Sequence, residues 1–114
     1  METTARRIEI LLILSRRRHE TVCNLANEFG VSERTIRRDI EMLSCIEPIY
    51  TRQGRYGGIY VTDNFSIFRK YMNENEINLL NFIIHYLEEK NEFKADDIYI
   101  LQRIIVTYTK PTFK

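Results

Sequence analysis

Residues 21–43, TVCNLANEFGVSERTIRRDIEML, contain two short helical patterns separated by a glycine. Thr21 is a favourable N-cap for a helix over 22–29, in which apolar residues recur at the i, i+3, i+4, i+7 spacing of one buried face. Gly30 can adopt the left-handed conformation that ends a helix and turns the chain, and Ser32 can cap a second helix. This succession of cap, helix, glycine turn, cap and helix predicts a helix-turn-helix.

The second of these helices combines a narrow apolar stripe with a basic outer face. At 100° per residue, Ile36, Ile40 and Leu43 share one side, and Arg34 and Arg38 lie almost opposite them. A helix that reads the major groove needs such a stripe to fix it on its scaffold, and guanidinium groups to reach base edges and phosphates. By itself, an amphipathic helix with three arginines is usually a solvated surface. Its combination with the caps and the turn favours DNA binding.

The string LANEFGVSERTIRRDIEML resembles the winged helix-turn-helix of DeoR-type bacterial regulators. Within that group it is most similar to the DNA-binding domain of the transcriptional regulators that carry a WYL effector domain. The resemblance covers residues 5–62 well and residues 63 to about 108 more loosely. It implies a winged domain that binds double-stranded DNA. Such regulators usually continue into an effector-binding domain, whereas this chain stops at Lys114.

Residues 49–62, IYTRQGRYGGIYVT, predict a β-hairpin wing. Pro48 forbids continuation of the preceding helix, and alternating side chains flank a glycine-rich turn over 53–58. The tip of this hairpin can lie over the adjacent minor groove or backbone, the alternative being an ordinary solvated hairpin. With the helix caps and the outer face of the second helix, it completes the set of expected DNA-binding residues: Thr21, Ser32, Glu33, Arg34, Thr35, Arg37, Arg38, Arg52, Arg55 and Tyr56.

A first helix, serving as the scaffold of the motif, is expected from a cap at Thr3 or Thr4 through about Arg18. Its apolar stripe is wider than a simple surface helix requires, so we expect it to touch more than the two helices that follow. We expect Arg6, Arg7 and Arg16 to Arg18 on its outer side. The inward side chains of this helix are expected to be Ile8, Leu11, Leu12 and Ser15.

After a connector over 63–72, which contains Phe65, Phe68 and Tyr71 and is expected to pack on the wing as a short helical piece, the pattern is again helical. Asn73 and Glu76 make a capping-box start for a helix through about Lys90. Residues 95–109 predict another helix that starts at Asp96 or Asp97, although their richness in Ile, Val, Tyr and Thr leaves a strand open.

Two such C-terminal helices would form a hairpin with more apolar surface than they can hide from water by themselves. A second copy of the hairpin would cover that surface, and the resemblance implies a dimerisation role for it. The alternative is that the hairpin folds back on the first helix of the same subunit. The residues expected at the dimer interface are Ile77, Leu80, Ile83, Ile84, Leu87, Leu101, Ile104 and Ile105.

Length and charge agree with a small DNA-binding protein. The 114 residues allow one core, or a small domain with an appendage. The net charge of +1 argues against a general binder of polyanions, but residues 1–62 carry ten arginines and no lysine against eight acids. Arginine suits bidentate contact with phosphate and guanine, which the point charge of lysine does not match geometrically.

Several other classes of function are not expected. Cys23 and Cys45 lack metal-ligand spacing and are expected to be free buried thiols, and His19 and His85 lie too far apart to pair with either. No catalytic triad, phosphate loop or carboxylate pair is visible, so we expect neither an enzyme nor a cofactor. The apolar run over 8–14 is too short for a membrane span and leads into arginines instead of a cleavage site. A cytoplasmic protein is expected.

The sequence therefore predicts a mainly α fold with a small β-hairpin. It would comprise a winged helix-turn-helix over 1–62, the connector over 63–72 and a helical dimerisation segment over 73–114. The expected function is a homodimeric, sequence-specific transcriptional regulator, a repressor that blocks polymerase at a pseudo-palindromic operator. The alternative is an adaptor that lacks an effector domain and pairs with another protein through its C-terminal helices. No small-molecule ligand is inferable from the sequence.

Overall fold

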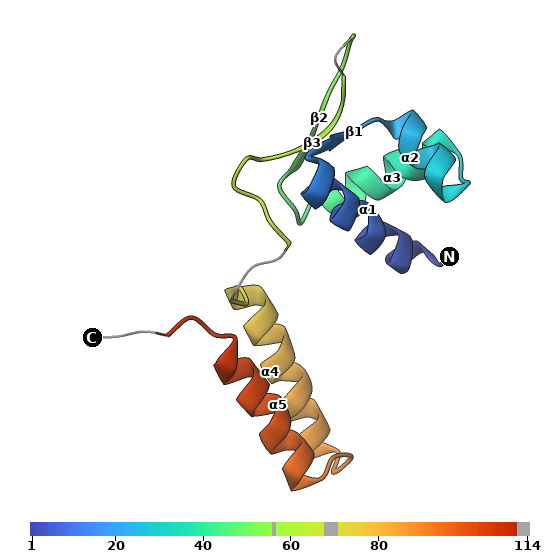
Figure 1. Ribbon diagram of the computed structural model, residues 1–114. Coiled ribbons are helices and arrows are strands. Elements are labelled where there is room, and N and C mark those ends of the chain that lie inside the picture. Colours follow the sequence, from blue (N-terminus) through green and yellow to red (C-terminus); the bar gives the residue numbers. More distant parts are fainter. Residues whose placement is uncertain (56, 68–70, 112–114) are drawn as a thin grey trace. The chain divides into compact units, whose positions relative to one another are not determined.

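The computed structural model describes residues 1–55, 57–67 and 71–111, and the chain divides into two compact units, 1–67 and 68–114. The first unit contains three helices and a small sheet, and the second is a pair of helices (Figure 1). The predicted mainly α fold with a winged helix-turn-helix is confirmed. In chain order the elements are α1 (Thr3–Arg17), β1 (His19–Glu20), α2 (Val22–Phe29), α3 (Glu33–Ser44), β2 (Ile49–Arg52), β3 (Gly58–Val61), α4 (Glu74–Glu89) and α5 (Ala95–Thr107).

Helix α1 is present, but its cap and its buried face differ from the expectation. Glu2 is the N-cap, and its carboxylate accepts the Ala5 N–H at 3.2 Å, so neither threonine has that role. The buried side chains are those of Ile10, Leu11 and Leu14, whereas Ile8 is 53% exposed. The wide apolar stripe allowed two choices of inner face. Contacts of α1 with α3, β1 and β3 select the one centred between positions 10 and 14.

The sheet has three antiparallel strands in the order β1-β3-β2, one more than the predicted hairpin. His19 of β1 is opposite Tyr60 of β3, and Tyr50 of β2 is opposite the same residue. Gly58 permits this approach, because a Cβ at that position would lie 2.9 Å from both the Glu20 carbonyl oxygen and His19 Nε2. The wing is thereby paired with the strand that leads directly into α2.

Arg18 joins the end of α1 to the chain that follows the wing. It ends the helix with a φ of 71°, and its guanidinium donates to the carbonyl oxygens of Thr62 and Phe65, each at 2.7 Å. The Phe65 side chain is buried in the core of the first unit, and Ile67 packs against that core. The expected short helix is not found in the described part of 63–72, and Phe68 lies outside the described residues.

In the second unit, α4 and α5 lie side by side as an antiparallel pair (Figure 1). The predicted capping box is confirmed, since Asn73 and Glu76 exchange side-chain to backbone bonds at 2.8 Å in both directions. Residues 95–107 are helical, which removes the strand alternative. Helix α5 begins after Lys94, whose side chain makes no capping bond, so the predicted start at Asp96 or Asp97 is slightly late. These aspartates lie in the first turn, where the helix dipole favours them.

Cys23 and Cys45 are free thiols, as predicted, but both are exposed, so their predicted burial is wrong. Cysteine is commonly buried as a residue type, but the exposure of these two side chains follows from their positions in the helices. The buried face of α2 is formed by Leu25 and Ala26, and Cys45 lies just beyond the last residue of α3. Within the described residues, no helix is long and apolar enough to cross a membrane.

Candidate nucleic-acid interface

The turn between α2 and α3 is built by the residues that the sequence singled out. Thr21 Oγ1 accepts the Asn24 N–H at 3.1 Å, and Ser32 Oγ accepts the Thr35 N–H at 3.1 Å. Gly30 has a φ of 65°, in the left-handed region, where a side chain would be strained. Both predicted N-caps and the glycine turn are therefore confirmed.

Helix α3 presents its arginines to solvent. Ile36, with Ile40 and Leu43, is buried in the core, which leaves Arg34, Arg37 and Arg38 on the exposed side. Arg37 Nη2 lies 3.3 Å from Glu33 Oε1, one helical turn earlier. The ion pair is exposed and adds little stability, but it biases the direction of the Arg37 side chain.

A buried charge cluster fixes α3 against α1. The side chain of Asp39 is fully buried, and its Oδ1 accepts from Arg6 Nη2 at 3.0 Å and from Arg7 Nε at 2.9 Å. Burial by itself would raise the pKa of Asp39, but the hydrogen bonds from Arg6 and Arg7 outweigh it, so the pKa lies below its usual value. The expected outward orientation of these two arginines is therefore wrong. Their long side chains reach around α1 to the one acid on the inner side of α3.

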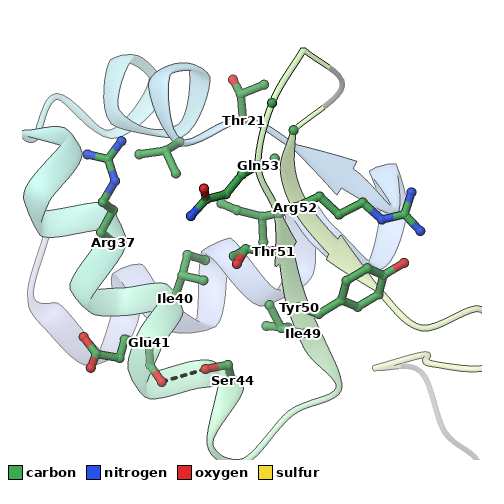
Figure 2. Close-up of a pocket in the computed structure, with 15 residues that line it drawn as sticks. Thr21, Arg37, Ile40, Glu41, Ser44, Ile49, Tyr50, Thr51, Arg52 and Gln53 are labelled. Carbon is green, nitrogen blue, oxygen red and sulfur yellow. Dashed lines mark hydrogen bonds between the residues drawn. The ribbon is translucent and has the colours of Figure 1, made fainter.

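A cleft of about 790 Å³ separates α3 and the start of α2 from the wing (Figure 2). Figure 2 shows the Gln53 side chain extending from the wing toward α3, where Arg37 and Glu41 border the same cleft. Thr21 and Thr51 add hydroxyl groups to its lining. The cleft is thus edged by a guanidinium, a carboxylate, an amide and hydroxyls, which supply both donors and acceptors for hydrogen bonds.

The residues expected from the sequence to contact DNA do not include Glu41 or Thr51, and they include Gln53 only as part of the wing tip that can lie over the minor groove or backbone. Glu41 follows Arg37 by four positions, which puts the two side chains on one side of a helix. Thr51 and Gln53 alternate with Tyr50 along the first wing strand, which puts them on one face of the sheet. The helical spacing and the strand alternation can each be read from the sequence. They show which residues share a face of one element, but not that this face of α3 and this face of the wing border the same cleft.

The wing residues of the predicted set fall in different places. The side chains of Tyr50 and Arg52 point away from α3 (Figure 2), and the Arg52 guanidinium carbon lies 5.0 Å from the centre of the Tyr60 ring. Arg55 is exposed in the turn of the hairpin, and Tyr56 lies outside the described residues. Thr21, Arg37 and Arg52 all line the cleft, but the Arg52 side chain extends away from α3 (Figure 2).

The expected dimerisation residues divide by their burial in the α4–α5 pair. Ile84 and Ile105 are buried between the two helices, at 4% and 7% exposure. Ile77, Leu87 and Leu101 are partly buried, whereas Leu80, Ile83 and Ile104 are exposed. Further large apolar side chains, which the sequence set did not include, are also exposed on this unit: Leu79, Phe82, Tyr86, Tyr99, Ile100 and Val106.

In the described part of the chain, no group of three or more His, Cys, Asp or Glu side chains is placed to hold a metal ion. The described residues of the cleft contain no histidine or cysteine, and its one lining carboxylate belongs to Glu41. The cleft is therefore suited to hydrogen bonding and to contact with charged groups.

Comparison with known proteins agrees with this geometry. Residues 6–60 match the family model described as HTH domain. Over 73 residues, which are 63% of this chain and 23% of the relative, the chain is 34% identical to a Bacillus subtilis (strain 168) protein named uncharacterized HTH-type transcriptional regulator YobV. The chain thus spans less than a quarter of that relative's length. No solved structure matches the chain significantly. Residues 6–60 have the fold of a helix-turn-helix domain, which the β2–β3 hairpin completes as a winged one.

Proposed function

We propose that this protein is a sequence-specific regulator of transcription, of the DeoR type with closest similarity to WYL-domain regulators, that binds DNA through α3 and the wing. The observation that carries the proposal is the exposed arginine face of α3 beside a cleft edged with hydrogen-bonding groups. A recognition helix in the major groove places its outer residues at base edges, and the flanking backbone must then pass close to the wing. The cleft is the space in which that backbone would lie.

The capping residues fit a role in phosphate binding. Thr21 Oγ1 already accepts the Asn24 N–H, so the hydroxyl hydrogen of Thr21 remains for donation. The Ser32 and Thr35 hydroxyl oxygens lie 3.0 Å apart, so one hydroxyl donates to the other and a single hydrogen is left for a ligand. Both caps stand at helix N-termini, where the dipole and the first N–H groups favour an anion. We assign Thr21 and Ser32 to phosphates, and Arg34 and Arg38 to base edges.

The active form in this proposal is a homodimer held by α4 and α5. The support is the exposed apolar surface of these helices, on which Phe82 is 69% and Val106 is 74% exposed. One winged helix covers a single half-site, so two symmetric subunits would engage a pseudo-palindromic operator. Binding there would block polymerase, which makes repression the proposed outcome and the cytoplasm the proposed location.

The same apolar surface favours a second candidate from another class. A partner protein of different sequence would cover Phe82 and Val106 as well as a second copy would. In that case the chain would be an adaptor, and its winged helix would hold a protein partner or would localise the complex. The two candidates differ in whether the isolated chain binds DNA and pairs with itself.

The test is a titration of a labelled pool of random duplexes of about two helical turns, repeated over a range of salt concentrations, followed by selection of the tightest binders. We expect binding at low salt, a steep loss of affinity with salt and enrichment of a two-fold symmetric site. The double variant Arg34→Ala/Arg38→Ala should lose enrichment, whereas Arg103→Gln, which removes one exposed positive charge from α5, is the control and should keep it. Absence of binding at low salt would overturn the proposal and favour the adaptor.

A further inference from the structure

We infer that the outer face of the wing is a second DNA-contact surface, on which Arg52, braced by Tyr50 and Tyr60, binds a phosphate of the strand opposite the one in the cleft. The inference rests on the proposed DNA binding. It assigns a DNA phosphate as the ligand of the wing face that points away from α3. The structural relation that carries it is a column of rings beneath one guanidinium group.

The column runs across all three strands. His19 and Tyr60 stack with their ring centres 4.5 Å apart and an interplanar angle of 27°, and Tyr60 and Tyr50 stack at 5.5 Å and 15°. These are the cross-strand partners of the sheet, so the stacking follows the register. Because β1 leads into the Thr21 cap of α2, the column ties the outer face of the wing to the helix-turn-helix.

Arg52 lies against this column, and its guanidinium makes no hydrogen bond or ion pair with another residue that the structure describes. Its guanidinium carbon lies 5.0 Å from the Tyr60 ring centre and 5.7 Å from that of Tyr50. A guanidinium over an aromatic face keeps its N–H groups for an anion, and it loses less freedom on binding than an unbraced side chain. Among the described residues, no acid pairs with Arg52. Glu20, the adjacent acid of β1, is engaged by Arg17, Asn24 and the Thr21 N–H.

The geometry of DNA indicates which anion this is. The minor groove is only about 6 Å wide, so a β-hairpin that lies along it has one phosphate strand beside each of its two faces. Thr51 and Gln53, on the face toward α3, border the cleft and would meet the first strand. Tyr50 and Arg52 point to the other side (Figure 2) and would meet the second. A wing with contacts on both faces would therefore bind the phosphates of both DNA strands.

The test separates the charge of Arg52 from the bracing by the rings. The probe is a labelled random duplex of about two helical turns, because a phosphate contact is independent of sequence, and the readout is affinity against salt concentration. Arg52→Gln should reduce the slope of log K against log salt by about one unit, as expected for one phosphate. Arg103→Gln, which removes a positive charge from the second unit, should leave the slope unchanged.

The rings are tested in both backgrounds. Tyr50→Leu/Tyr60→Leu should weaken binding about two- to fivefold when Arg52 is present, the effect expected for a lost cation–π contact at an exposed site. Tyr50→Phe/Tyr60→Phe, which keeps both ring faces, should bind as the wild type does. In the Arg52→Gln background the leucine pair should cause no further loss, because the rings act through the arginine. Thermal unfolding followed by circular dichroism checks that each variant is folded.

Three results would overturn the inference. One is an unchanged salt slope for Arg52→Gln, which would make the outer face a surface for something other than DNA, such as an acidic protein segment. Another is an equal loss of DNA affinity from Tyr50→Leu/Tyr60→Leu with and without Arg52, which would show that the stacked rings stabilise the hairpin and do not act through Arg52. The third is failure of the wild-type protein to bind any duplex at low salt, which would remove the proposed function as well and is thus distinguishable from the first two.

Discussion

Asp39 of α3 and Arg6 of α1 are 33 positions apart in sequence and form a two-point contact, in which Arg6 Nε donates to Oδ2 and Arg6 Nη2 donates to Oδ1 at 3.0 Å. The Arg7 guanidinium is a second cation at this carboxylate, with its Nε 2.9 Å from Asp39 Oδ1. Because both oxygens of the carboxylate are held, this contact fixes the rotation of α3 about its axis as well as its position. The direction in which Arg34 and Arg38 point therefore depends on two α1 residues that contact the buried side of α3, opposite these arginines.

Removal of this carboxylate should destabilise the first unit strongly. Asp39→Ala leaves two arginine groups, with side-chain exposures of only 11% and 28%, without their anion. Breaking a buried pair in this way costs about 3 kcal/mol or more, whereas the exposed Arg37–Glu33 pair contributes less than about 1 kcal/mol. Urea unfolding of the full chain should show a large loss for Asp39→Ala and almost none for the control Glu33→Ala. Equal losses in the two variants would contradict the buried role of Asp39.

The same contact predicts how stability depends on pH. The pKa of Asp39 is lowered in the folded protein, so the folded state releases its proton more readily than the unfolded state. The resulting stability is fully present above the ordinary aspartate pKa of about 4, and it is lost as the pH falls through the lower folded value. Glu20 behaves likewise: burial raises its pKa, but bonds from the Thr21 N–H, Asn24 and Arg17 outweigh this and lower it.

Asp39→Asn should therefore flatten the acid limb of the stability curve without abolishing it, since Glu20 still contributes. The measurement is the urea midpoint of the wild type and of Asp39→Asn, taken at a series of pH values from neutral to about 3. An acid limb of unchanged steepness in the variant would show that Asp39 does not carry the dependence.

Arg34 should determine sequence preference. It lies on the side of α3 opposite Ile36 and is exposed, so its guanidinium can reach a base edge from the first turn of the helix. Arg34→Ala should cost about 1 to 3 kcal/mol on the selected site and relax the preference at one base pair. Competition titrations with site variants measure both effects. An equal loss on selected and random duplexes would make Arg34 a phosphate contact.

The parts of this fold that could be predicted from the sequence are those specified by neighbouring residues. Thr21, Gly30 and Ser32 act within three or four positions of themselves, and the Asn73–Glu76 box does the same, so their structures were predictable. Strand β1 was missed because two residues are too few to show an alternation. The Arg6–Asp39 contact was missed because no local pattern relates residues 33 positions apart.

The candidate site shows the same division. Alternation along β2 separates Tyr50 and Arg52 from Thr51 and Gln53, but it does not say which pair faces α3. That choice follows from the pairing of β3 with both β1 and β2, a relation between distant segments. The exposed face of α3, by contrast, follows from the positions of Ile36 and Ile40 within a single helix.

The burial of Ile84 decides how the proposed dimer should be tested. At 4% exposure, this side chain packs within the α4–α5 pair, so Ile84→Glu should unfold the pair and would not report on association alone. Phe82 and Ile83 are 69% and 42% exposed, and a charge on either alters the outer surface without entering the packing of the two helices. The informative variant is Phe82→Glu/Ile83→Glu, with Asn81→Glu on the polar side of α4 as its control.

In a dimer, binding of the first half-site makes the second an intramolecular event. Phe82→Glu/Ile83→Glu should therefore sediment as a folded monomer and lose about 10²-fold or more in affinity for the selected symmetric site, with a smaller loss on random duplexes. Asn81→Glu should remain dimeric and bind as the wild type does. Sedimentation velocity, far-ultraviolet circular dichroism and titration of the same preparations measure these quantities together. A double variant that is still dimeric, or a wild type that binds its site tightly as a monomer, would place the apolar surface of α4 in another contact.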